Sequence, residues 1–367
     1  MYVNTPEALP AFEQLCEVAT SCAIDVEFMR RRTYRPIVAL IQLYINNQYT
    51  ILFDPLALDA PPAFIKMLKN PNCVKVFHAC PQDLEALYLK YDFFPENIFD
   101  TQVAAAFCGM GYQMGLARFL NELLGIELVK GQQQSDWCKR PLTESQLSYA
   151  QNEVIWLYDA YKKVEQKLIE CHNLDFYHAY MQEYTSYFQN QIQQVEVPPY
   201  SIKGTGTFNA KSLTRAVHLA NWRLQQAMDH DLPINWVLKH DTLLFIAQSK
   251  IAGYEIWQTL HKQRQNYNKR VKEALEIELK ELDQLDASEY IAPIKHVKPS
   301  DDEKKVLGKL MNLIGKIAKE RSIAAEILAP RAKVMHLVQS GIHVPASLLD
   351  GWRAELLQDV FEENLNK

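Results

Sequence analysis

Two carboxylates stand two residues apart in an otherwise apolar segment, residues 22–29, which reads CAIDVEFM. Such a segment predicts a β-strand, and because side chains alternate between the two faces of a strand, Asp25 and Glu27 point to the same side. Two like charges side by side repel each other, and burial increases the repulsion. The pair therefore requires a cation, a shared proton or a fully solvated face.

Other acidic residues lie at the starts of predicted helices or along them. Asp83 follows a predicted strand and stands in the first turn of a helix predicted over residues 81–91, where a carboxylate is also a common cap. Asp100 likewise ends a strand and begins a helix, and we assign it as a cap. Glu153 lies four residues after Tyr149 in a predicted helix, so both project from one face. Taken alone, these two form an ordinary pair.

These carboxylates would form a single site if the fold brings them close together. Asp25, Glu27, Asp83 and Glu153 at one edge of a sheet would repel each other strongly unless metal ions filled the space between them. Oxygen ligands without accompanying His or Cys favour hard divalent ions, Mg²⁺ or Mn²⁺, over zinc. Two such ions about 3.5–4 Å apart form the clamp used in phosphodiester cleavage. The hydroxyl of Tyr149 beside them would orient the attacking water.

The elements that must position these residues alternate between strand and helix. The order, three strands with hairpin links followed by strands separated by helices, predicts a mixed sheet with helices on both faces. Asn46 and Asn47 predict the turn between the second and third strands. The strands are predicted over residues 22–29, 36–45, 48–54 and 73–79, with a short fifth near 98–100.

The chain turns helical from Thr143, a capping-type residue that begins a long helical period. A Gln-rich stretch at residues 188–207 contains two prolines and two glycines, so we interpret it as a domain boundary. Pro299 suggests a second boundary, and the sequence between and beyond these boundaries is helical in pattern.

Composition places the chain among ordinary globular proteins. It has 367 residues, of which 48% are hydrophobic and 23% charged, and its net charge of -5 argues against binding nucleic acid by bulk charge. Residues 1–170 hold 15 basic against 20 acidic residues, whereas residues 295–367 hold 12 against 10.

No apolar run is long enough to span a bilayer, the first residues lack a secretory signal pattern, and the seven cysteines form no C-x-x-C pair. We therefore expect a cytoplasmic protein without a membrane partner.

Several of these segments together resemble the ribonuclease D family, within the tyrosine subclass of the DEDD exonuclease superfamily. The first family motif is matched by Asp25-Val26-Glu27-Phe28 and continues through RRRTYRPIVALIQLY, and the second by HACPQDLEAL, which contains Asp83. The segments FDTQVAAAFCGMG and SDWCKRPLTESQLSYA are also similar. The third motif is Tyr, three residues, then Asp; here Tyr149 is present, but Glu153 occupies the Asp position.

The resemblance implies a fold and an activity. The fold is a ribonuclease H-like exonuclease domain, with a five-stranded mixed sheet in the order 3-2-1-4-5 and strand 3 antiparallel, followed by two small all-α domains of the type shared with RecQ helicases (HRDC). The implied activity is 3′-to-5′ exoribonuclease, with 5′-monophosphates as products. Asp25, Glu27, Asp83 and Glu153 would hold two Mg²⁺ or Mn²⁺ ions, and Tyr149 would serve the attacking water.

The resemblance also divides the chain and implies its partners. We expect an exonuclease domain at 1–170, a helical linker at 171–207, a first helical domain at 208–290 and a second at 295–367. The partner is RNA with a free 3′ end, including transfer RNA precursors, and a monomer is favoured. The helical domains would bind structured RNA.

Two alternatives remain open from the sequence. The same carboxylates serve DNA 3′-to-5′ exonucleases, because discrimination depends on contacts to the 2′-hydroxyl. Glu153 carries its carboxylate one methylene further than aspartate, so a catalytically weakened RNA-binding protein is the other alternative.

The arginines in RRRTYR, residues 30–35, either hold substrate phosphates or line a solvated loop. We interpret Phe28 as a core residue and His78 as a packed, hydrogen-bonded histidine.

Overall fold

The computed structural model describes the chain except for residues 129–130, 132–134, 250–257, 259, 261–268, 294–297, 341–347 and 366–367. The described residues form two compact units. The first comprises Met1–Met29, Ile37–Asn190 and Pro299–Lys367, and the second comprises Arg30–Pro36 and Gln191–Lys298. The predicted domain boundaries stay predictions, and the predicted start of the last domain, residue 295, lies outside the described residues.

The first unit contains a mixed six-stranded sheet in the order β1-β4-β3-β2-β5-β6. The predicted mixed sheet is therefore confirmed, and the strand order 3-2-1-4-5 corresponds to β4-β3-β2-β5-β6. A short strand, β1, pairs with β4 and was not predicted. The strands are β1 Tyr2–Val3, β2 Ser21–Met29, β3 Ile37–Ile45, β4 Tyr49–Phe53, β5 Val74–Phe77 and β6 Ile98–Asp100.

One predicted strand direction is wrong. We expected the third strand, β4, to be the antiparallel one, but β3 is antiparallel to both of its neighbours, β2 and β4. Two successive chain reversals restore the original direction, so β4 runs the same way as β2. The second reversal uses the predicted turn, where Asn46 and Asn47 both have positive φ, 52° and 56°, as hairpin turns of this kind require.

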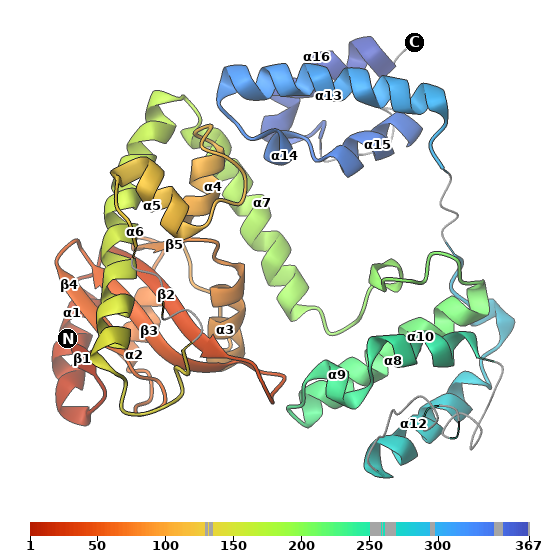
Figure 1. Cartoon of the computed structure of the whole chain (residues 1–367), viewed down its shortest axis with the longest axis horizontal. Coiled ribbons are helices and arrows are strands. Elements are labelled where there is room, and N and C mark those ends of the chain that lie inside the picture. Colours follow the sequence, from red (N-terminus) through yellow and green to blue (C-terminus); the bar gives the residue numbers. More distant parts are fainter. Residues whose placement is uncertain are drawn as a thin grey trace. The chain divides into compact units, whose positions relative to one another are not determined.

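Helices cover both faces of the sheet, as predicted (Figure 1). On one face, Phe12 of α1, Phe64 of α2 and Leu84 of α3 share an apolar core with Ile24 and Leu43 of the sheet. On the other face, α6 packs across β2, β3, β4 and β5. The helices of this part are α1 Leu9–Glu17, α2 Pro62–Leu68, α3 Pro81–Tyr91, α4 Thr101–Ala106, α5 Leu116–Leu124, α6 Glu144–Glu170 and α7 Leu174–Gln193, with a 3-10 turn at Pro6–Ala8.

Two predicted caps begin helices of this unit. The hydroxyl of Thr143 accepts a hydrogen bond from the backbone N–H of Gln146, and the Gln146 side chain accepts one in return from the backbone N–H of Thr143, which completes a capping box at the start of α6. The carboxylate of Asp100 accepts from the backbone N–H groups of Gln102 and Val103 and so caps α4. The long helix over residues 144–170 therefore begins where the sequence indicates.

The C-terminal helices belong to the same compact unit as the sheet. The backbone N–H of Ala324 donates to the carbonyl of Ala106 at 2.7 Å, and the side-chain amide of Asn173 donates to the carbonyls of Phe107 and Arg321. Trp352 contacts Phe107 with ring centroids 5.4 Å apart. These helices are α13 Asp301–Arg321, α14 Ala325–Leu328, α15 Arg331–Ser340 and α16 Gly351–Leu365.

The described part of the second unit is helical, as predicted for this region. Leu213 and Leu219 of α8 pack with Leu243 of α10 and Leu275 of α12 in a separate apolar core. Its helices are α8 Ala210–Asp229, α9 Ile234–Val237, α10 His240–Gln248 and α12 Lys269–Leu282, with 3-10 turns at Pro199–Ser201 and Ala287–Glu289.

Candidate active site

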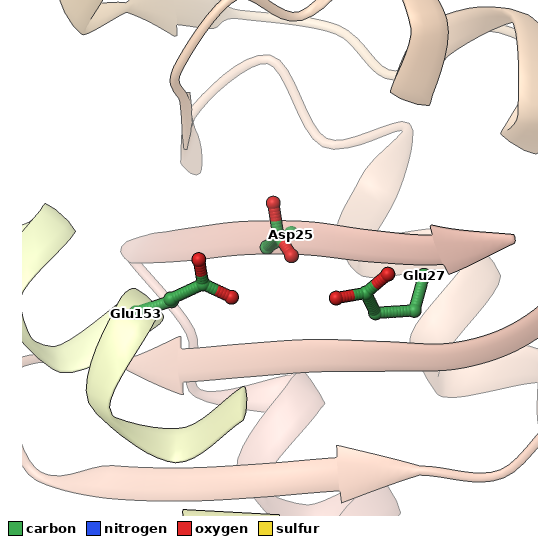
Figure 2. Close-up of side chains that lie close together, drawn as sticks. All are labelled: Asp25, Glu27 and Glu153. Atoms are coloured by element: carbon green, nitrogen blue, oxygen red, sulfur yellow. The ribbon is translucent and has the colours of Figure 1, made fainter. Parts of the chain in front are cut away.

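Three of the predicted carboxylates meet on the face of the sheet that α6 covers. Asp25 and Glu27 extend from β2, and Glu153 extends toward them from α6 (Figure 2). One oxygen of each lies within 4.8 Å of one oxygen of each of the others. This convergence joins residues 128 positions apart in sequence.

Alternation along β2 explains why the pair faces α6. Ala23 contributes to the core beneath α6, whereas Ile24 contributes to the core of the opposite face. Asp25 and Glu27 continue the series that begins with Ala23, because side chains two residues apart share a face. The pairing register of β2 with β3 shifts directly after Glu27, so an irregularity interrupts the ladder beside the site before pairing resumes at Phe28.

Packing of α6 brings Glu153 to this pair. Ala150 and Val154, which flank it on the helix, are fully buried against the sheet. Glu153 itself is only 8% exposed and therefore lies between the helix and the strands. A carboxylate in this place has lost most of its water.

The negative charges of the three carboxylates are not balanced by a described cationic side chain. Burial raises the pKa of Asp25 to about 6. Burial and the charges of Asp25 and Glu153 raise the pKa of Glu27 to about 9, and burial and the charge of Asp25 raise that of Glu153 to about 8. Among the described residues, no Lys or Arg forms an ion pair with them. The cluster therefore favours binding of protons or a cation.

Asp83 lies near this cluster but outside the group of three. It stands in the first turn of α3, as expected, and is 9% exposed. Burial and the charges of Asp25, Asp100, Glu27 and Glu153 raise its pKa well above the ordinary value. Its carboxylate is not among those whose oxygens lie within 4.8 Å of one another. Asp83 therefore shares the electrostatic environment of the cluster without completing it.

Tyr149 lies one helical turn before Glu153 and touches it. Its hydroxyl donates to Oε1 of Glu153 at 2.6 Å, which favours the ionised carboxylate and opposes the effect of burial. The Tyr149 ring lies beside Trp137, with centroids 6.4 Å apart. Trp137 is buried, so it is not free to stack on a base.

The segment before α6 is held by an ion pair that the sequence did not indicate. Nε and Nη2 of Arg140 donate to the two carboxylate oxygens of Asp54 at 2.6 and 2.7 Å. Arg140 also donates to the carbonyls of Trp137, Lys139 and Ala39. The hydrogen bonds from Arg140 and Tyr2 outweigh burial and hold the pKa of Asp54 below its usual value. Arg140 thus joins this segment to β3 and to the end of β4.

Two further expectations concern nearby residues. The ring of His78 contacts the hydroxyl of Thr101 and the carbonyl of Met114, so it is packed and hydrogen-bonded as expected. Phe28 is partly buried against the core on the α1 face, in agreement with a core residue. Whether the arginines at 30–35 hold phosphates stays a prediction. Within the described ranges, no helix is long and apolar enough to cross a membrane.

The sheet order, the helices on both faces and the acidic cluster define a ribonuclease H-like 3′-5′ exonuclease domain. Residues 1–169 match the 3′-5′ exonuclease family. The chain is 30% identical to ribonuclease D of Serratia proteamaculans over 94% of each chain, and 33% identical to that of a Shewanella species over 68% of this chain and 64% of the relative.

A solved structure agrees over the whole length. The crystal structure of RNase D from Escherichia coli, an exoribonuclease involved in structured RNA processing, has a TM-score of 0.84 and 26% identity, covering 100% of this chain and 98% of the other. The chain belongs to the ribonuclease D family and is a 3′-5′ exoribonuclease. Its family implies divalent metals, and the acidic cluster is present.

Proposed function

We propose that this chain removes nucleotides one at a time from the 3′ ends of RNA and releases 5′-monophosphates, with two divalent ions held by Asp25, Glu27, Asp83 and Glu153. The observation that carries the proposal is the convergence of Asp25, Glu27 and Glu153 within 4.8 Å, without a described cationic partner.

The donor set fits hard divalent ions. All the ligands are carboxylate oxygens, and no His or Cys belongs to the group found among the described residues. Mg²⁺ and Mn²⁺ prefer such ligands. When bound, these ions supply an activated water and stabilise the leaving oxygen of the phosphodiester. Glu153 serves in the place where the family pattern has aspartate, because its carboxylate reaches the pair on β2.

Tyr149 is proposed to hold the attacking water. Its hydroxyl donates to Glu153, which places the phenol oxygen beside the carboxylate cluster where the water would be held. The contact with Trp137 restricts the ring, and the capping box at Thr143 fixes the first turn of the helix that carries it. Tyr149 therefore has a defined orientation before substrate arrives.

The proposed substrates are structured RNAs, including transfer RNA precursors with extra 3′ nucleotides. Support comes from the full-length similarity to RNase D of Escherichia coli, an exoribonuclease involved in structured RNA processing, and from the helical regions, which we propose to be HRDC-type domains that bind such RNA. We retain the predicted cytoplasmic location and monomeric state; the seven free cysteines support the former.

The test follows RNA and DNA of matched sequence, labelled at the 5′ end, with Mg²⁺, with Mn²⁺ and with chelator. Stepwise shortening of RNA that requires metal is expected, and the Asp25→Asn variant should remain folded but lose both this activity and the rise in melting temperature that metal causes. Faster shortening of DNA would contradict the substrate class. RNA binding without shortening would contradict the catalytic assignment of Glu153.

A further inference from the structure

A buried glutamine lies beside the cluster and has no role in the function proposed above. Gln42 stands in the middle of β3, directly opposite Asp25 of β2 and Leu52 of β4. Residues opposite one another in an antiparallel pair point to the same face. Ile41 and Leu43 on either side belong to the core of the other face. The Gln42 amide therefore lies on the α6 face, next to Asp25.

The buried side-chain amide of Gln42 lowers the stability of the folded protein. Gln42 is 0% exposed, and neither Nε2 nor Oε1 has a hydrogen-bond partner among the residues that the structure describes. An unpaired buried polar group costs about 1–3 kcal/mol, and an apolar side chain of the same shape would avoid that cost. Its neighbours along β3, from Val38 to Ile41 and at Leu43, are apolar. Stability alone therefore does not explain an amide at this position.

An amide is chemically suited to the neighbour it has. A lysine or arginine at this position would neutralise the carboxylate of Asp25 and compete with a bound cation. An amide N–H donates a hydrogen bond to a carboxylate oxygen and leaves its charge in place. Donors of this kind orient carboxylates that bind metal, and their loss typically weakens metal affinity or activity by about 10–100-fold.

We propose that Gln42 is a positioning residue for Asp25: when a cation binds, the Gln42 side chain turns so that Nε2–H donates to one carboxylate oxygen of Asp25, a hydrogen bond that it does not make in the present structure, and so directs the other oxygen toward the cation. This proposal rests on the metal site proposed above. Gln42 does not touch the substrate; it acts through Asp25.

The test compares Gln42→Leu with the wild type in three measurements: melting temperature in chelator, Mn²⁺ affinity by calorimetry, and kcat and KM on a short RNA. We expect Gln42→Leu to melt in chelator at or above the wild-type temperature. Its Mn²⁺ affinity and kcat should fall about 10–100-fold, with KM little changed. Gln42→Met provides a second apolar replacement if the branched side chain disturbs packing.

The control is Tyr44→Phe, two residues further along the same face of β3, where the ring packs edge-on against Tyr158. This variant should keep wild-type metal affinity and kcat. If both Gln42 variants keep wild-type Mn²⁺ affinity and kcat while Asp25→Asn loses both, the role of Gln42 is overturned but the proposed metal site stands. If the wild type itself bound no Mn²⁺, the metal site and the role of Gln42 would fail together.

Discussion

Glu153 brings a longer side chain to a position where the family pattern has aspartate. An added methylene moves a carboxylate outward, but the α6 backbone and the rotamer decide where the charge lies. In this structure the Glu153 carboxylate lies with those of Asp25 and Glu27 and accepts a hydrogen bond from Tyr149. The geometry supports a retained ligand and disfavours a residue that has moved away from the site.

Removing this carboxylate should slow the chemical step. Glu153→Ala is expected to lower kcat by about 10²–10³, the usual loss when one group that stabilises developing charge is removed. Glu153→Asp should be tolerated because it restores the shorter ligand of the family. Single-turnover rates of the wild type and both variants provide the measurement. If the wild type is fast and Glu153→Ala is equally fast, Glu153 has no part in catalysis.

The carboxylate cluster should make the stability of the metal-free protein depend on pH. Burial and neighbouring charges raise the pKa of Glu27 to about 9 and that of Glu153 to about 8, above the ordinary value of 4.5. The folded state therefore binds more protons than the unfolded state between these values, and stability is lost as pH rises from about 5 to about 9. Bound metal favours the ionised carboxylates and should reduce this loss.

The measurement is the melting temperature from pH 5 to 9 in chelator and in saturating Mg²⁺. Groups outside the site titrate in both series, so the difference between the two curves reports the cluster. The stabilisation by Mg²⁺ should grow as pH rises. A constant difference across this range would show that the cluster does not exchange protons for metal.

At the scale of elements, α6 and the segment before it decide where Tyr149 and Glu153 lie. The capping box fixes the start of the helix, and Ala150 and Val154 fix the face that packs on the sheet. Arg140 joins the preceding segment to β3 and β4 through Ala39 and Asp54. The position of the site thus depends on a network that does not itself touch the reacting atoms.

Loss of this network should destabilise the fold. The side chain of Asp54 is 1% exposed, and Arg140→Ala leaves it with two donors in the described part of the chain, the Tyr2 hydroxyl and the backbone N–H of Leu56. Breaking a buried ion pair by removing one partner costs about 3–5 kcal/mol. Arg118→Ala is the matched control, because Arg118 pairs with Glu122 at the surface and should cost less than about 1 kcal/mol. Urea unfolding measures both; equal effects would show that the buried pair has no special importance.

At the scale of the whole molecule, the C-terminal helices and the exonuclease domain share one apolar core. Ile314, Ile327 and Trp352 belong to the same buried cluster as Phe107 and Tyr177. Arg353 forms an ion pair with Glu183 at 2.7 Å beside them. A chain that ended near residue 200 would keep the proposed catalytic residues but would expose this face of α4 and α7.

Trp352 should contribute strongly to the stability of this unit. Trp352→Ala removes a buried side chain that contacts Phe107, Phe176 and Tyr180, a change that costs about 3–5 kcal/mol. Trp236→Ala, at a position that is 56% exposed in α9, is the control and should have little effect. Thermal unfolding with near-UV circular dichroism compares them. If both variants melted like the wild type, the shared core would not stabilise the exonuclease domain.

Local sequence determined the features that depend on neighbouring residues. The period of two in β2 placed Asp25 and Glu27 on one face, the Thr143–Gln146 pair began α6, and Asn46 and Asn47 adopted the positive φ of the hairpin turn. These features follow from backbone sterics and from hydrogen bonds between residues close in the chain. The long ordered motifs also identified the family.

Only the tertiary structure decided which distant residues meet. Segments far apart in the chain are joined by the pairing of β1 with β4, by the place of Glu153 beside Asp25 and by the ion pair of Arg140 with Asp54. The burial of the Gln42 amide likewise depends on the sheet and helix that enclose it. A local pattern indicates that a face is apolar or acidic but does not specify what covers it. That choice is made by the joint burial of faces on separate elements, which is a property of the whole fold.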